Sequence, residues 1–187
     1  MSNEKIAVIL AAAGKSSRFA DPHYKKPFAK LGDRAVWLHA ARHFVDRADV
    51  AQVIVVISPD DEEYFQQMFG SNAAVMGLDV VLGGERRQDS VANGLNAVNP
   101  DITMVAIHDA ARPCLHEKWI DRVFQKAPES GAAILSTPVV ATIKKSSDFQ
   151  TVEKTIDRTG LYQAQTPQVF RRALLEKAFA DHGHAEF

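Results

Sequence analysis

Five short apolar runs rich in Val and Ile recur along the chain, separated by segments whose apolar residues repeat every three to four positions. The short runs predict buried strands, and the intervening repeats predict amphipathic helices. Strand and helix in alternation predict a Rossmann-like α/β fold, in which right-handed crossovers build a mostly parallel sheet with helices on both faces. The strands are expected at 6–10, 53–57, 78–82, 104–107 and 133–135, and the helices at 37–45, 91–98 and 119–124.

The length and composition of the chain fit a single domain, 1–187, and exclude several classes of protein. A net charge of −1 argues against the global basic surface of nucleic-acid binders. No apolar stretch approaches the roughly 20 residues that a membrane span needs. Cys114 is the one cysteine, which excludes an intrachain disulfide and a cysteine-based zinc site. We therefore expect a cytoplasmic protein in which Cys114 is a small packed thiol.

Three chemically rich loops follow predicted strands, at 11–26, 83–90 and 108–113. In open α/β sheets, ligands bind beyond the carboxyl ends of the strands, so these loops are expected to surround one site. The first loop begins with small residues, which let a backbone approach a ligand closely. Cations suited to phosphates follow, although a solvated basic face would have the same composition. The cations are Lys15, Arg18, Lys25, Lys26, Lys30 and Arg34.

The second and third loops add a glycine pair and a set of charged residues. Gly83 and Gly84 predict a tight turn beside a base, with backbone amides free to read it, or else a simple turn from strand to helix. Asp109 and Arg112 follow a core strand, where charges have little structural use, although a structural ion pair is the alternative.

Other chemistries find little support in this sequence. Gly14-Lys15-Ser16 lacks the earlier glycine of a Walker A loop, because Ile9 occupies that position. His39 and His43 are four residues apart, but the glutamate of a zinc-protease motif is missing, so packed or surface histidines are expected. The sequence contains no Gly-x-Ser-x-Gly motif, so a serine hydrolase is not supported. A polar stretch at about 140–160 predicts an excursion from the core, either a surface hairpin or an arm that contacts another subunit.

Six segments in order resemble those of the 2-C-methyl-D-erythritol 4-phosphate cytidylyltransferase family. They are the Ala-Ala-Ala-Gly loop with Arg18, Lys26-Pro27-Phe28, the segment from Gly83 to Val91, His108-Asp109-Ala110-Ala111-Arg112-Pro113, the segment from Pro138 to Lys144, and Asp157-Arg158 with Gln165-Thr166-Pro167-Gln168. The resemblance implies a Rossmann-like nucleotidyltransferase fold with a protruding dimerisation arm. It also implies transfer of a cytidylyl group from CTP to 2-C-methyl-D-erythritol 4-phosphate in isoprenoid biosynthesis, giving 4-diphosphocytidyl-2-C-methyl-D-erythritol and pyrophosphate.

The resemblance implies a role for each matching residue. Magnesium, or another divalent cation, would bridge the triphosphate oxygens without a dedicated protein cage. The chain would form a homodimer, and its arm would reach the partner subunit's substrate. By resemblance the catalytic residues are Arg18, Lys26 and Arg158, the CTP-binding residues are Ala12, Ala13, Gly14, Gly84, Glu85, Arg87 and Ser90, and the acceptor-binding residues are Asp109, Arg112, Thr142 and Thr166.

The sequence departs from the family pattern at several positions. Ser16, Ala141 and Tyr162 replace residues that are commonly glycine, aspartate and tryptophan, but none of them removes a phosphate-binding cation. The family's later Thr-Asp-Glu segment, and an Asn-Ile-Lys whose lysine positions the substrate, are expected beyond Phe187 and are absent from this sequence. Two alternatives therefore stay open: a ribitol-5-phosphate cytidylyltransferase, and a catalytically impaired nucleotide-binding module.

Overall fold

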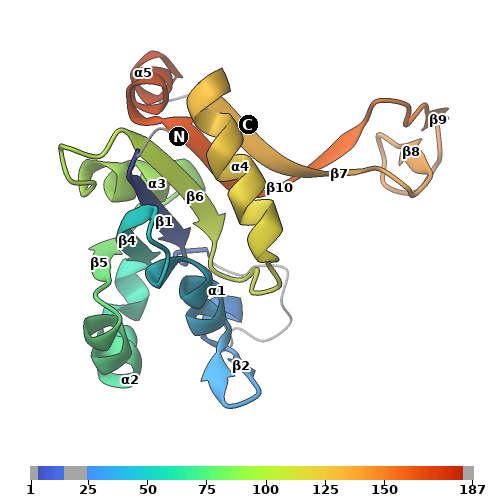
Figure 1. Cartoon of the computed structure of the whole chain (residues 1–187). Helices are drawn as coiled ribbons and strands as arrows, with labels where there is room; N and C mark the ends of the chain where they lie inside the picture. The colour runs from blue at the N-terminus through green and yellow to red at the C-terminus, as the bar shows by residue number, and fades with distance from the viewer. Residues whose placement is uncertain (1–3, 15–24, 183–187) are drawn as a thin grey trace.

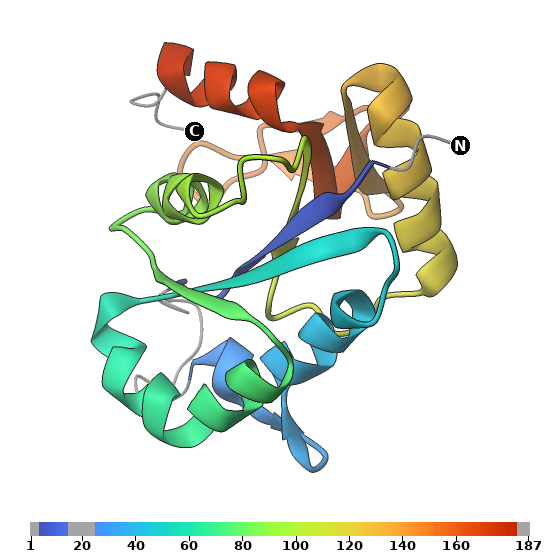
Figure 2. The ribbon, with the colours of Figure 1, turned by 60° about the vertical axis from the view of Figure 1, so that its left-hand side comes forward.

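The computed structural model describes residues 4–14 and 25–182, which form a six-stranded sheet flanked by helices (Figures 1 and 2). The strand order is β5-β4-β1-β6-β10-β7. Four neighbouring strands, from β5 to β6, run parallel, and β10 runs antiparallel to both of its neighbours. The predicted mostly parallel sheet is confirmed. The strands are β1 (Ile6–Ala11), β4 (Val50–Ile57), β5 (Asp79–Leu82), β6 (Met104–Asp109), β7 (Ala132–Pro138) and β10 (Tyr162–Arg171).

Helices cover both faces of this sheet, as the alternating pattern predicts. Alternate residues of β1 point to opposite faces, so Val8 and Leu10 enter one core and Ile9 enters the other. The first core lies under α1, α2 and α4, and the second lies under α3 and α5. The helices are α1 (Val36–Val45), α2 (Glu62–Val75), α3 (Arg87–Asn96), α4 (Glu117–Ser130) and α5 (Arg172–His182), with the short 3-10 helices η1 (Lys26–Phe28) and η2 (Pro59–Asp61).

Two side chains differ from their expected burial. Trp119 was expected in the apolar stripe of its helix, but it is 50% exposed, because α4 buries the face that carries Ile120, Val123 and Phe124. Cys114 was expected to be packed and is exposed, since it lies in the loop before α4. Both residues line a cavity described below.

Helix α3 packs close to the sheet at Gly94, and its first turn lies beside the loop after β1. A Cβ atom on Gly94 would lie 2.8 Å from Cγ2 of Ile9 and 3.0 Å from Cγ2 of Val56, closer than side chains tolerate. Glycine at this position therefore allows the contact.

Strands β7 and β10 pair with each other where they leave the core, and they lead into a two-stranded hairpin of β8 (Ile143–Lys145) and β9 (Lys154–Ile156). Figure 1 shows this arm projecting away from the sheet and its helices. The hairpin lies in the segment at about 140–160 where the sequence predicts an excursion, and its role in dimerisation stays a prediction. A second small hairpin joins β2 (Lys30–Leu31) and β3 (Arg34–Ala35). None of the helices within residues 4–14 and 25–182 is long and apolar enough to cross a membrane.

Candidate active site

The described start of the first loop, residues 11–14, meets the second and third loops at the carboxyl ends of the parallel strands. Ala11 at the end of β1 pairs with Asp109 at the end of β6, and the amide of Ala110 donates to the carbonyl oxygen of Ala11 over 3.1 Å. On the other side of β1, the amide of Ala12 donates to the carbonyl oxygen of Val56. The amide of Gly83 donates to the carbonyl oxygen of Ile57, which extends the same edge. Residues 11–14 and the other two loops therefore converge at one place, as predicted.

Close packing around Ser90 leaves no room for a side chain at Gly83 or Gly84. A Cβ atom on Gly83 would lie 2.6 Å from Oγ of Ser90 and 2.8 Å from Cβ of Ala13, and one on Gly84 would lie 2.5 Å from Cβ of Asp89. The amide of Gly84 donates to Oγ of the buried Ser90 over 3.1 Å. The hydroxyl thus engages the amide of Gly84, which was expected to be free to read a base. Ser90 holds the shape of the loop.

Asp109 joins the second loop to the third. Its Oδ1 accepts a hydrogen bond from Nη2 of Arg87 and its Oδ2 accepts one from Nε of Arg112, each over 2.8 Å. Burial alone would raise the pKa of Asp109, but the hydrogen bonds and charges of Arg87 and Arg112 outweigh burial and hold this pKa below its usual value. Asp109 is therefore ionised at neutral pH and fixes both guanidinium groups. No motif spacing indicates this pairing, because 22 residues separate Arg87 from Asp109.

Thr166 reaches the same place from the antiparallel strand β10. Ala164 pairs with Ser136 and Gln168 pairs with Ile134, so three residues of β10 oppose one residue of β7. Such a bulge bends a strand and re-aims its side chains. The hydroxyl of Thr166 accepts from the amide of Asp109 over 3.2 Å and lies 2.9 Å from Nδ1 of His108.

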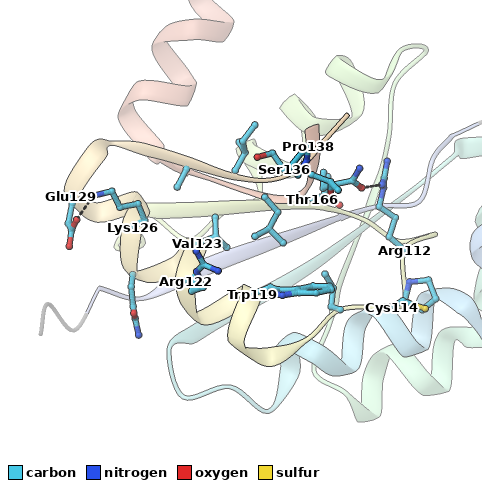
Figure 3. Close-up of a pocket in the computed structure, with 18 residues that line it drawn as sticks. Arg112, Cys114, Trp119, Arg122, Val123, Lys126, Glu129, Ser136, Pro138 and Thr166 are labelled. Atoms are coloured by element: carbon cyan, nitrogen blue, oxygen red, sulfur yellow. Dashed lines mark hydrogen bonds and ion pairs between the residues drawn. The ribbon is translucent and has the colours of Figure 1, made fainter. Parts of the chain in front are cut away.

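A cavity of about 960 Å³ opens between α4 and β7 and reaches Arg112 and Thr166 at one end. Figure 3 shows Arg112 and Thr166 on one side of this cavity, with Trp119 and Arg122 across from them. The sequence did not single out Arg122 as a candidate, because the exposed face of a helix commonly carries such cations. Cationic, hydroxyl and aromatic groups suit a small polyol phosphate at this end.

Comparisons with known proteins identify the relatives of this chain. The family model for 2-C-methyl-D-erythritol 4-phosphate cytidylyltransferase matches residues 6–186. The chain belongs to this cytidylyltransferase family. A relative of that name from Rhodopirellula baltica is 37% identical over 186 residues, which cover 94% of this chain and 75% of the relative. A chloroplastic relative from Oryza sativa is 36% identical over 96% of this chain and 59% of its own length.

Solved structures of cytidylyltransferases share the fold. The enzyme from Thermus thermophilus superposes with a TM-score of 0.76 at 29% identity, over 98% of this chain and 79% of its own. The 4-diphosphocytidyl-2C-methyl-D-erythritol synthase from Anaerococcus prevotii gives a TM-score of 0.79 at 26% identity, over 99% of this chain and 78% of its own.

Among the cations predicted for this cytidylyltransferase, Lys26 lies on a firmly anchored segment. Pro27 and Phe28 are buried, and the ring of Phe28 packs in an aromatic cluster with Phe65 and Phe69 of α2. Nζ of Lys25 lies 2.6 Å from Oδ2 of Asp61. These contacts fix the backbone on which Lys26 stands. Arg18 lies outside the described residues.

The other predicted site residues divide between the core and the arm. Ala12, Ala13, Gly14 and Glu85 belong to the converging loops, whereas Thr142 and Arg158 flank the hairpin of the arm. Arg158 donates to the carbonyl oxygen of Val140, which braces the base of this hairpin. Within the described part of the chain, no hydrogen bond or ion pair connects the arm to Asp109, Arg112 or Thr166. The structure therefore assembles the core residues and leaves the arm residues apart from them.

His39 and His43 each form a hydrogen bond with a backbone carbonyl oxygen. Nε2 of His39 donates to the carbonyl oxygen of Leu31, and Nε2 of His43 donates to that of Pro113. These hydrogen bonds fit the packed or surface histidines that the sequence predicts. Residues 4–14 and 25–182 contain no group of three or more His, Cys, Asp or Glu side chains that could hold a metal ion.

Substituting Gly84 tests the packing of the glycine loop. Gly84→Ala should lower stability by about 1–3 kcal/mol, the usual cost of overpacking, and should raise the KM for CTP because the loop must shift. Gly70→Ala is the matched control, since its Cβ would meet only the flexible end of Gln66 and alanine favours the interior of α2. Thermal unfolding and steady-state kinetics measure both variants. Unchanged melting and KM in Gly84→Ala would contradict the packing argument.

Proposed function

We propose that this chain transfers the cytidylyl group of CTP to 2-C-methyl-D-erythritol 4-phosphate, a step of isoprenoid biosynthesis, and releases pyrophosphate. The observation that supports this most is Asp109, which holds Arg87 of the glycine loop and Arg112 beside Thr166 in one array. The glycine loop lies directly against Ala13, and this close approach favours a single-ring base over a larger purine. Membership of the family supplies the identity of the reaction.

The chemistry in this proposal follows from charge. An oxygen of the acceptor's phosphate attacks the α-phosphorus of CTP and forms a new P–O bond. The bond to the bridging oxygen breaks, and pyrophosphate leaves with the electron pair. Two anions must meet while negative charge builds up, so fixed cations lower the barrier. Arg18 and Lys26 would supply those charges. No general base is required, because the attacking phosphate is already ionised at pH 7.

Magnesium is part of the proposal as an ion that arrives with the nucleotide. Both carboxylate oxygens of Asp109 already accept hydrogen bonds from arginines, so the triphosphate oxygens of CTP would be its ligands. Magnesium keeps several waters and commonly binds through substrate phosphates, which fits this donor set. When bound, it would neutralise part of the triphosphate charge.

The proposal includes a homodimer, in which the arm would complete the partner's site. The arm exposes Val140 and Phe149, which are 80% and 97% accessible, and this favours contact with another surface. Thr142 and Arg158 would then bind the acceptor held by the partner's Asp109 and Arg112. The cytoplasm remains the proposed location, which suits a chain with a single cysteine.

A pyrophosphate-release assay tests the proposed function. With magnesium and 2-C-methyl-D-erythritol 4-phosphate, CTP should support turnover, and ATP and GTP should give values of kcat/KM lower by about tenfold or more, because the close approach of the glycine loop to Ala13 disfavours a larger base. Ribitol 5-phosphate should be the poorer acceptor. Chelation should abolish turnover, and added magnesium should restore it.

Three outcomes of this assay would count against the proposal. Equal rates with the three nucleotides would contradict the base preference. Faster turnover of ribitol 5-phosphate would favour the other cytidylyltransferase. Release of no pyrophosphate with either acceptor would favour an impaired nucleotide-binding module.

A further inference from the structure

We propose that His108 is a positioning residue, which holds Thr166 and the backbone of Arg112 in the arrangement that binds the acceptor. The inference rests on the proposed function, because it assigns Thr166 and Arg112 to the acceptor site. His108 lies on β6 directly before Asp109 and is fully buried. No step of the proposed chemistry uses its imidazole.

The hydrogen bonds around His108 define one tautomer. Its Nε2 lies 3.0 Å from the carbonyl oxygen of Arg112. A carbonyl oxygen can only accept, so Nε2 carries the proton and donates. In a neutral imidazole, Nδ1 is then an acceptor. The hydroxyl of Thr166 lies 2.9 Å from this Nδ1 and is its donor.

The same hydroxyl accepts from the amide of Asp109, so the bonds form one continuous chain. They run from the amide of Asp109 to the hydroxyl of Thr166, then to the imidazole, and finally to the carbonyl of Arg112. This chain ties the bulge of β10 to the loop after β6. An apolar side chain of similar size could fill the space but could not make either bond of the imidazole.

The surroundings of His108 keep the required tautomer neutral. The pKa of His108 is lowered to about 4, mainly by burial, although the bond to the carbonyl of Arg112 and the charge of Asp109 act in the opposite direction. The charges of His43 on α1 and of the guanidinium of Arg112 contribute to the lowering. The ring of Phe44, also on α1, lies 5.3 Å away and adds no charge. Nδ1 is therefore an acceptor at neutral pH, as the chain of bonds requires.

Three substitutions separate the two bonds from packing. His108→Asn keeps an acceptor near Nδ1, His108→Gln keeps a donor near Nε2, and His108→Leu keeps neither. Because an unsatisfied buried group disturbs its neighbours, His108→Leu should raise the KM for the acceptor about 10- to 100-fold and change the KM for CTP less than threefold. His108→Asn and His108→Gln should give smaller increases. A residue that only supports packing would shift both KM values together.

A double variant tests whether His108 acts through Thr166. Combining His108→Leu with Thr166→Val should raise the acceptor KM little beyond the larger single effect, because both changes break the same chain of bonds. If the acceptor KM of the double variant rose by the product of the two single effects, the proposal would be overturned. His43→Gln is the matched control, since His43 bonds the same loop at Pro113 and takes no part in the hydrogen bonds of Thr166. An equal rise of acceptor KM in this control would also overturn it.

Two readouts do not depend on activity and so separate this inference from the proposed function. Nitrogen-15 NMR of the imidazole should show His108 protonated at Nε2 and neutral from pH 7 down to pH 5. The unfolded chain takes up a proton on this imidazole near pH 6.5, and the native chain takes it up only near pH 4. The native state is therefore destabilised relative to the unfolded state as the pH falls from 6.5 towards 4. The melting temperature should therefore fall more from pH 7 to pH 5 in the wild type than in His108→Leu. An Nδ1–H tautomer or identical pH dependence would refute the inference even if turnover proved absent.

Discussion

Arg18→Ala should lower the turnover number by roughly 100- to 1000-fold while the KM for CTP rises far less. The reason is that a preorganised cation stabilises charge that develops only in the transition state, and loss of one such stabiliser costs about 3–4 kcal/mol. Lys26→Ala should have an effect of the same order, because Phe28 and Lys25 fix the segment on which Lys26 stands. Steady-state kinetics with both substrates measure the effects.

Lys30→Ala supplies the control, since Lys30 is an exposed cation of the same basic stretch with no assigned role. Its turnover should stay within about twofold of the wild type, as expected for a surface charge. If Arg18→Ala retained the wild-type turnover number, Arg18 would be an ordinary surface cation. The basic stretch would then be the solvated face that its composition also allows.

Mixing two inactive variants should restore activity if the arm serves the neighbouring subunit. Arg18→Ala and Arg158→Ala homodimers should each be nearly inactive. In a twofold dimer each site would combine one core with the other arm, so a heterodimer has one site with both lesions and one with neither. Random exchange makes about half of the dimers heterodimers, which predicts roughly one quarter of wild-type activity per total sites.

A chain carrying both substitutions gives the reciprocal control. Mixed in equal amounts with wild type, it should reduce activity to about one quarter, because each site of the heterodimer then has one lesion. If Arg158 acted within its own chain, this mixture would keep about one half, and the first mixture would recover nothing. Mass spectrometry should confirm that subunits have exchanged in each mixture. Absent recovery despite exchange would exclude an arm that completes its neighbour's site.

Strands β1, β4 and β6 of the parallel part were predictable because they are largely buried on both faces. Such strands consist of continuous β-branched runs, which stand out from amphipathic helices. Strand β10 escaped prediction because Pro167 interrupts it and because polar residues occupy much of its outer half. Proline within an apolar run argues against a central strand, yet here it belongs to the bulge that presents Thr166. Helix α2 was missed because its buried stripe consists of only Phe65, Phe69 and Ala73.

The convergence of the three loops was also predictable, since the topological rule for parallel sheets requires only the positions of the strands. Which charged residues pair with each other inside the site was not predictable. Residues such as Arg87 and Asp109 meet because α3 packs closely on the sheet, and that distance depends on Gly94. Likewise His108 reads in the sequence as one more polar residue at a strand end. Only the packed structure shows which atoms its two nitrogens contact.

Asp109 also changes the thermodynamics of recognition. Arginine side chains carry about 2 kcal/mol of rotamer entropy, and much of it is normally lost when a ligand immobilises them. Here the carboxylate immobilises Arg87 and Arg112 during folding, while their side chains stay 55% and 46% accessible. The ordering cost therefore falls on the folding of the chain, and a phosphate that arrives meets donors already held in place.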